Sequence, residues 1–175
     1  MIVRSLRATG FMRYQELDLK DLPNGVIALE GDNESGKTTL GEAVAFALFG
    51  RTIRTEDTDP TQAINWDVDE CRTRIEFEVP EKGRFTVERT VRRTGEFEAT
   101  LNGPEGTIAE GPKAVTEALC GVVGFDFPTF RYSFYVAQGE LDLVRREGRD
   151  NAQRIVHDML GITTIERART LLETE

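Results

Sequence analysis

The amino-acid sequence predicts an α/β fold in which a strand, a glycine-rich loop and a helix are followed by antiparallel hairpins. The continuous apolar run 26–29 is typical of a strand that is buried on both faces. Apolar residues recur at helical spacing between 40 and 48, and Gly50 follows where a helix cap belongs. Residues 73–101 alternate between apolar and polar side chains, as antiparallel strands do.

The segments around these elements follow the same logic. Two short strands are expected before residue 20, and the polar stretch 51–71 is expected to be a long loop. Pro112 is expected to open a helix, because proline is favoured in the first helical turn. Residues 130–137 are aromatic and β-prone, which predicts a strand. Helical spacing returns from residue 150 and continues to the end of the sequence.

Composition limits the class of protein. The chain has 175 residues, enough for one domain with a core, and its net charge of −9 argues against a protein that coats nucleic acid over its whole surface. Cys71 and Cys120 lie far apart, which predicts reduced thiols rather than a disulfide or a metal site. No apolar run has the length of a membrane span and no signal peptide is recognisable, so we expect a cytoplasmic protein without a membrane partner.

Residues 31–38 read Gly-Asp-Asn-Glu-Ser-Gly-Lys-Thr and match the complete P-loop pattern G-x-x-x-x-G-K-[ST]. The glycines Gly31 and Gly36 allow the backbone to turn its N–H groups towards phosphate oxygens, and the following helix adds partial positive charge. Lys37 is expected to reach the β- and γ-phosphates, and the Thr38 hydroxyl to bind Mg²⁺. The sequence therefore predicts a site for ATP with Mg²⁺.

A P-loop alone does not say what is done with the nucleotide. The Asn-Lys-x-Asp motif with which GTPases read the base is absent from the sequence. A small-molecule kinase remains open, although hairpins follow the helix where a helical lid would be expected. A nucleotide-gated interaction module that does not hydrolyse its ligand is a further alternative.

The details of the loop resemble one class of P-loop protein. Residues 31–40, with Asn33 and the ending Gly-Lys-Thr-Thr-Leu, are similar to the Walker A motif of SMC-type ABC ATPases, and Phe11 lies in a similar N-terminal strand–turn. Residues 135–142, Tyr-Val-Ala-Gln-Gly-Glu-Leu-Asp, resemble the Q-loop of the Rad/SbcC double-strand-break repair ATPases. Residues 154–162 are similar to the helix that leads those proteins into a coiled coil. The resemblance covers nearly the whole chain.

The resemblance implies the N-terminal half of a split ATPase head of the ABC/SMC type, with a core sheet, an antiparallel β lobe and the start of a helical lobe. In that family a C-terminal segment supplies the signature motif, the Walker B acid and the switch histidine, none of which is found in this sequence. We therefore expect little hydrolysis by this chain alone. The expected single half-domain 1–175 has four parts: 1–50, the strand–P-loop–helix core; 51–110, the hairpin lobe; 111–149, a helix, a strand and the Q-loop; and 150–175, helices leading towards a coiled coil.

The resemblance also implies partners and a process. These are the C-terminal segment of the same ATPase, a second head in a homodimer, a nuclease subunit, and DNA bound through its backbone during double-strand-break repair. The alternative within the class is a chromosome-organising or other coiled-coil ATPase without a nuclease. Basic side chains form two clusters, Arg84, Arg89, Arg92 and Arg93 in the hairpins and Arg145, Arg146 and Arg149 further on. Each cluster can be read as a solvated face with interleaved glutamates, and the alternative is that the hairpin arginines engage DNA backbone phosphates without reading sequence.

The resemblance extends the candidate site beyond the P-loop. Lys37 and Gln138 are the expected catalytic residues, and Thr38 and Gln138 are the expected contacts of Mg²⁺. Gln138 would sense the γ-phosphate, since an amide donates and accepts hydrogen bonds without adding charge. The expected nucleotide-binding residues are Arg13, Asn33, Glu34, Ser35, Gly36, Lys37, Thr38 and Thr39.

Overall fold

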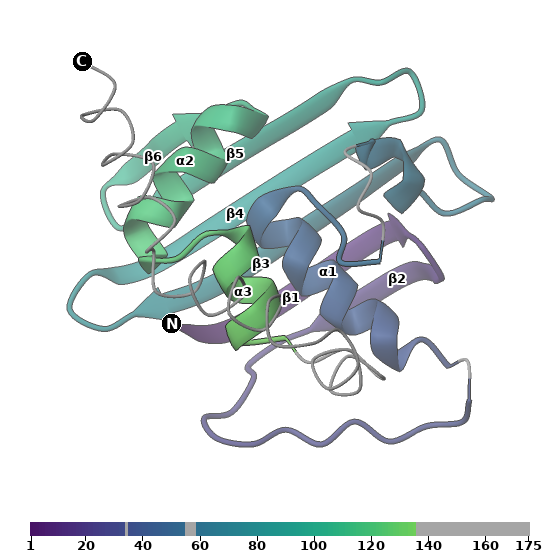
Figure 1. Ribbon diagram of the computed structural model, residues 1–175, viewed down its shortest axis with the longest axis horizontal. Coiled ribbons are helices and arrows are strands. Elements are labelled where there is room, and N and C mark those ends of the chain that lie inside the picture. Colours follow the sequence, from purple (N-terminus) through teal and green to yellow (C-terminus); the bar gives the residue numbers. More distant parts are fainter. Residues whose placement is uncertain (34, 55–58, 136–175) are drawn as a thin grey trace, which may run out of the picture. The chain divides into compact units, whose positions relative to one another are not determined.

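The computed structural model describes residues 1–33, 35–54 and 59–135. Six strands form one antiparallel sheet in the order β2-β1-β3-β4-β5-β6 (Figure 1). The chain divides into two compact units, the first being Met1–Gly124, and α3 belongs to the second. The elements are β1 (Ile2–Phe11), β2 (Tyr14–Leu19), α1 (Lys37–Phe49), the 3-10 helix η1 (Pro60–Ala63), β3 (Glu70–Val79), β4 (Gly83–Arg92), β5 (Phe97–Gly103), β6 (Gly106–Glu110), α2 (Pro112–Val123) and α3 (Phe127–Ser133).

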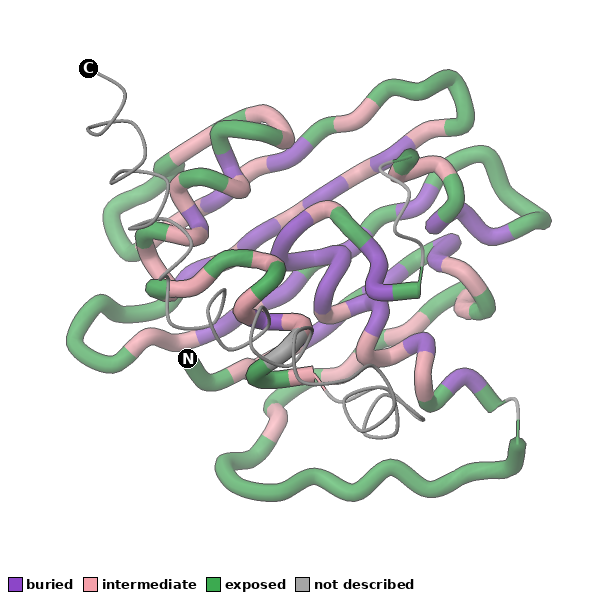
Figure 2. Tube along the Cα trace, viewed as in Figure 1, coloured by how far each residue is buried: buried purple, intermediate pink, exposed green. Residues whose placement is uncertain are grey.

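The predicted alternation in the hairpins is confirmed. Ile75, Phe77, Val87 and Leu101 all lie on the inner face of the sheet and are fully buried. Helices α1 and α2 cover this face, and the buried stripes of the central strands lie beneath them (Figures 1 and 2). Pairing of alternating strands therefore places one apolar row per strand under the helices, as the period of two requires.

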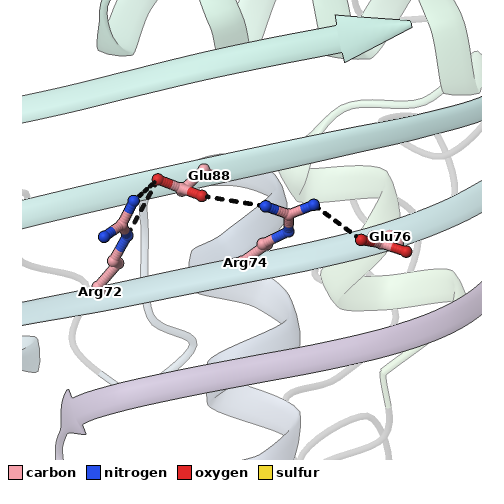
Figure 3. A network of polar contacts seen from close by, with 4 residues as sticks. All are labelled: Arg72, Arg74, Glu76 and Glu88. Atoms are coloured by element: carbon pink, nitrogen blue, oxygen red, sulfur yellow. Dashed lines mark hydrogen bonds and ion pairs between the residues drawn. The ribbon is translucent and has the colours of Figure 1, made fainter. Parts of the chain in front are cut away.

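The outer face of the same strands carries charged side chains. Arg72 pairs with Glu88, and Arg74 bridges Glu88 and Glu76, with Arg74 Nη2 2.9 Å from Glu76 Oε1 (Figure 3). These side chains are partly exposed, so each ion pair contributes at most about 1 kcal/mol. The row of alternating charges keeps this face compatible with water.

Helix α1 forms the centre of the core. Gly50 ends it in the left-handed conformation, with φ 68°, and its N–H donates to Phe46 O at 2.7 Å. The ring of Phe46 packs 5.4 Å from that of Phe11 and 6.2 Å from that of Phe97. The last turns of α1 are buried on all sides, because the sheet, α2 and the loop after α1 surround them.

The buried Arg89 overturns one expectation. The sequence suggests an exposed contact for DNA, but the side chain lies on the inner face and only 1% of the residue is exposed. Its Nη2 donates to Leu48 O at 2.8 Å and its Nε to Ala47 O at 3.1 Å, at the C-terminal end of α1. It also donates to Thr116 Oγ1 and Pro112 O in α2. Burial lowers the pKa of this guanidinium to about 10. Arg89 therefore joins α1 to α2 and is inaccessible to DNA.

The apolar run 26–29 does not form the strand that the sequence predicts. It is irregular, Val26 is 100% exposed and Leu29 is 51% exposed. Figure 2 shows this run within the long exposed loop between β2 and α1. A strand buried on both faces requires paired neighbours, and no described strand pairs with this run.

The prediction of a strand at 130–137 is also wrong for the part that the structure describes. Residues Phe127–Ser133 form helix α3 instead. The Asp126 carboxylate accepts a hydrogen bond from Thr129 N at 3.0 Å, and Pro128 occupies the first turn. The ring of Phe125 packs against that of Phe130 at 6.4 Å. A helix cap and a first-turn proline outweigh the β propensity of the aromatic residues here.

The remaining expectations from composition can be compared directly with the structure. Cys71 and Cys120 are thiols that form no disulfide, and burial raises the pKa of the Cys71 thiol to about 12. The predicted loop 51–71 is irregular where described as far as residue 69, apart from η1 and the bridge between Ile64 and Phe11, and its last two residues already belong to β3. No helix in the described part of the chain is long and apolar enough to cross a membrane.

Candidate nucleotide-binding site

The P-loop leads directly into helix α1, as the sequence predicts. Gly36 caps the helix in the left-handed conformation with φ 97°, and Lys37 is the first helical residue. The first N–H groups of a helix lack partners within the helix and carry partial positive charge. The loop therefore presents main-chain donors and a helix end in one place, which is the arrangement that binds phosphate.

The Lys37 side chain folds back over the loop. Its Nζ donates to Gly31 O at 2.7 Å and to Asp32 O at 2.6 Å, and the residue is exposed to solvent. Thr38 is half-buried behind it, whereas Thr39 is buried. Because main-chain carbonyls are neutral acceptors, a phosphate that entered the loop would compete favourably for the ammonium.

Tyr14, which the sequence did not single out, fixes the end of the P-loop. Its hydroxyl donates to Gly36 O at 2.8 Å, and burial raises the pKa of the phenol. A Cβ at Gly36 would lie 3.2 Å from Tyr14 Cε1, so a larger residue would push against the ring. The only signal in the sequence was an aromatic residue at the start of the second strand, beside Arg13.

The loop after η1 is bound tightly to the turn between β1 and β2. Met12 N donates to Ala63 O at 2.8 Å, and Asn65 N donates to Gly10 O at 2.8 Å. The Asn65 side chain is buried and its Nδ2 donates to Met12 O at 2.5 Å. These bonds place residues 64–67 next to Arg13, which is exposed at the same turn.

A hollow of about 490 Å³ lies between the P-loop, this turn and the loop after η1. Arg13, Tyr14, Ser35, Asn65 and Trp66 are among its lining residues. The structure thus brings two predicted binding residues, Arg13 and Ser35, to one concave surface. Its volume falls in the range of small-molecule sites, roughly 300–1,000 Å³.

Glu42 is a second residue that the sequence did not single out. Its side chain is fully buried on α1, and its Oε2 accepts a hydrogen bond from Ile53 N at 2.5 Å. Arg54 Nε lies 3.5 Å from Glu42 Oε1. Through these partners the buried carboxylate holds the segment after α1 against α1 itself, the helix that follows the P-loop.

Several predicted residues are not brought to this site. Glu34 and Gln138 lie outside the described residues, as do Arg145, Arg146 and Arg149, so their roles stay predictions. Of the hairpin arginines, Arg92 pairs with Glu70 and Glu96, Arg93 donates to main-chain carbonyls, and Arg84 is exposed. In the described part of the chain, no cluster of three or more His, Cys, Asp or Glu side chains could hold a metal ion.

Comparisons with known sequences point to one family. A family model described as an AAA domain matches residues 5–174. A "DNA double-strand break repair Rad50 ATPase" of Methanosarcina mazei is 28% identical over 177 residues, which covers 97% of this chain and 16% of the relative. The SbcC component of the SbcCD nuclease of Deinococcus radiodurans is 26% identical over 168 residues, covering 93% of this chain and 18% of the relative. The chain thus spans less than a fifth of either relative.

Solved structures agree on the fold. A chain from work on ATP-driven dimerization and DNA-stimulated activation of SMC ATPases has a TM-score of 0.72 at 18% identity, covering 91% of this chain and 99% of that chain. A RecF–ATP structure has a TM-score of 0.54 at 18% identity, covering 62% and 28%. Identities this low establish the fold alone, and they confirm the predicted α/β P-loop class. The chain belongs to the AAA domain family and is an N-terminal segment of an SMC/SbcC-type ATPase.

Proposed function

We propose that this chain is the ATP-binding segment of an ATPase that acts in DNA double-strand-break repair together with a nuclease subunit. The observation that carries the proposal is the complete P-loop at the start of α1, with the Lys37 ammonium folded over it. The names of the two relatives support the process, since one is a repair ATPase and the other is part of a nuclease.

Each residue of the loop has a distinct role in this proposal. The main-chain N–H groups of the loop and of the first turn of α1 bind phosphate oxygens. Lys37 exchanges the carbonyls of Gly31 and Asp32 for the β- and γ-phosphates. Thr38 and Gln138 would hold Mg²⁺, which neutralises phosphate charge when it is bound. Arg13 faces the same hollow and adds a positive charge beside the nucleotide.

The exposed apolar run 26–29 supports a shared site. It directly precedes the P-loop, and a strand from a C-terminal segment could pair with it and cover it. Hydrolysis also requires a positioned water and charge stabilisation on the side of the γ-phosphate away from the P-loop. We therefore assign those groups to the C-terminal segment and to a second head, and we expect little turnover from this chain alone.

The test is to replace Lys37 by alanine and to measure ATP binding by calorimetry. Loss of a charge-assisted contact to phosphate should lower ATP affinity about tenfold to a hundredfold, while thermal unfolding stays unchanged because the side chain is exposed. Lys113→Ala is the matched control, since Lys113 is an exposed lysine in the first turn of α2. Unchanged ATP affinity in a folded Lys37→Ala protein would contradict the proposal.

A further inference from the structure

Trp66 is a large aromatic residue that the structure leaves almost entirely in solvent. It is 92% exposed, whereas the rings of Phe11 and Phe46 close by in the fold are fully buried. Tryptophan is highly buried on average, so a ring this exposed is a candidate for contact with a ligand if its surroundings form a site. It is also the only tryptophan in the chain.

The loop that carries Trp66 is held at its backbone from two sides. Asn65 binds Met12 through its side chain, and its Oδ1 accepts from Asp67 N at 3.0 Å. Arg93 on the other side donates from Nη2 to Asn65 O at 2.8 Å and to Trp66 O at 3.4 Å. The main chain on both sides of Trp66 is therefore fixed while its ring projects into solvent. A ring presented in this way loses little conformational entropy when a ligand stacks on it.

Trp66 lies beside the P-loop, at the edge of the hollow where a nucleotide would bind. Trp66 and the P-loop residue Ser35 line the same hollow of about 490 Å³, together with Arg13 and Tyr14. A nucleotide whose phosphates lie on the P-loop can therefore extend its base along this hollow towards Trp66. Aromatic side chains beside a few polar groups are the usual lining of small-molecule sites.

We propose that Trp66 is the stacking platform for the nucleobase of the bound nucleotide. The inference rests on the proposed function, because the P-loop must hold the phosphates. Trp66 is not part of the P-loop pattern. Its stacking would determine how strongly the base contributes to nucleotide affinity. Stacking does not depend on the identity of the base, since every base offers a π-face.

The single tryptophan makes the proposal directly measurable in the full chain. Acrylamide quenching of Trp66 fluorescence should fall at least about twofold when ATP saturates the protein, because the base covers one face of the ring. Inorganic tripolyphosphate, which has no base, should bind in a Lys37-dependent manner without protecting Trp66. Protection that grows with protein concentration in the absence of nucleotide would overturn the proposal and assign the ring to a surface between copies.

Two variants separate stacking from structure. Trp66→Ala should lower ATP affinity about tenfold and leave tripolyphosphate affinity unchanged, whereas Trp66→Phe should retain most of the ATP affinity. Equal losses for both ligands, or no loss for either, would overturn the assignment. If ATP binds in a Lys37-dependent way but neither protects Trp66 nor responds to Trp66→Ala, only this inference fails. If no Lys37-dependent binding occurs, the proposed function fails with it.

Discussion

The central strands of the sheet and the apolar run 26–29 both carry large apolar side chains but lie in opposite environments. Leu101 on β5 is fully buried, whereas Leu29 is 51% exposed. The strands β3, β4 and β5 each have hydrogen-bonded neighbours on both sides and helices over one face. The run 26–29 has no partner strand among the described residues. The difference shows that apolar sequence alone does not make a strand, which also needs neighbours to satisfy its backbone groups.

The largest expected effect lies on the buried side of this comparison, at Arg89. Arg89→Met should lower the free energy of unfolding by about 4 kcal/mol, because it leaves the buried carbonyls of Ala47 and Leu48 without their donor. Arg84→Met is the matched control on the exposed end of the same strand and should change stability by less than about 0.5 kcal/mol. Urea denaturation measures both. Equal effects would mean that Arg89 does not hold the helices in solution.

A matched pair of leucines tests the comparison itself. Leu101→Ala should cost about 3 kcal/mol of unfolding free energy, because it opens a cavity in the core. Leu29→Ala should cost less than about 0.5 kcal/mol in the isolated chain, since half of Leu29 already contacts water. Denaturation midpoints of the two variants give the answer. A large loss at Leu29 would show that the run is packed after all.

The smallest expected effect on stability is at Val26, which is 100% exposed. Val26→Lys should leave the free energy of unfolding unchanged within about 0.5 kcal/mol, yet lower self-association of the isolated chain, because it interrupts an exposed apolar run. Static light scattering at rising protein concentration is the measurement. Thr94→Lys adds the same charge in an exposed turn and controls for charge alone. If both variants disperse the chain equally, the run is not the associating surface.

Much of the fold could be predicted because it depends on local patterns. The alternation in β3 to β5 and the helix start at Pro112 each follow from a few neighbouring residues, and both predictions are confirmed. The run 26–29 and the segment from residue 127 could not be predicted in this way. Pairing of a strand depends on chain that is distant in sequence, and α3 depends on a cap at Asp126 that competes with β propensity.

The residues of the candidate nucleotide-binding site also fall into those set by local sequence and those set by contacts between distant segments. The position of Lys37 at the start of α1 was predictable, because the spacing of the P-loop fixes it. Tyr14, Asn65 and Trp66 were not, because each reaches the P-loop region through contacts between segments far apart in the sequence. Arg89 was misjudged for a different reason. The period of two places it on the same face of β4 as Phe85 and Val87, but its charge favoured an exposed position, and the main-chain acceptors that allow its burial come from helices distant in the sequence.

The hydrogen bonds of Arg89 to both helices couple the position of α1 to that of α2. The helix has 13 residues, and at about 1.5 Å per residue it is a rod roughly 20 Å long. One end carries the P-loop, and Arg89 joins the other end to the first two turns of α2 through Pro112 and Thr116. A displacement of α2 would therefore move the phosphate-binding loop through helix α1. A displacement of the loop would move α2 through the same helix.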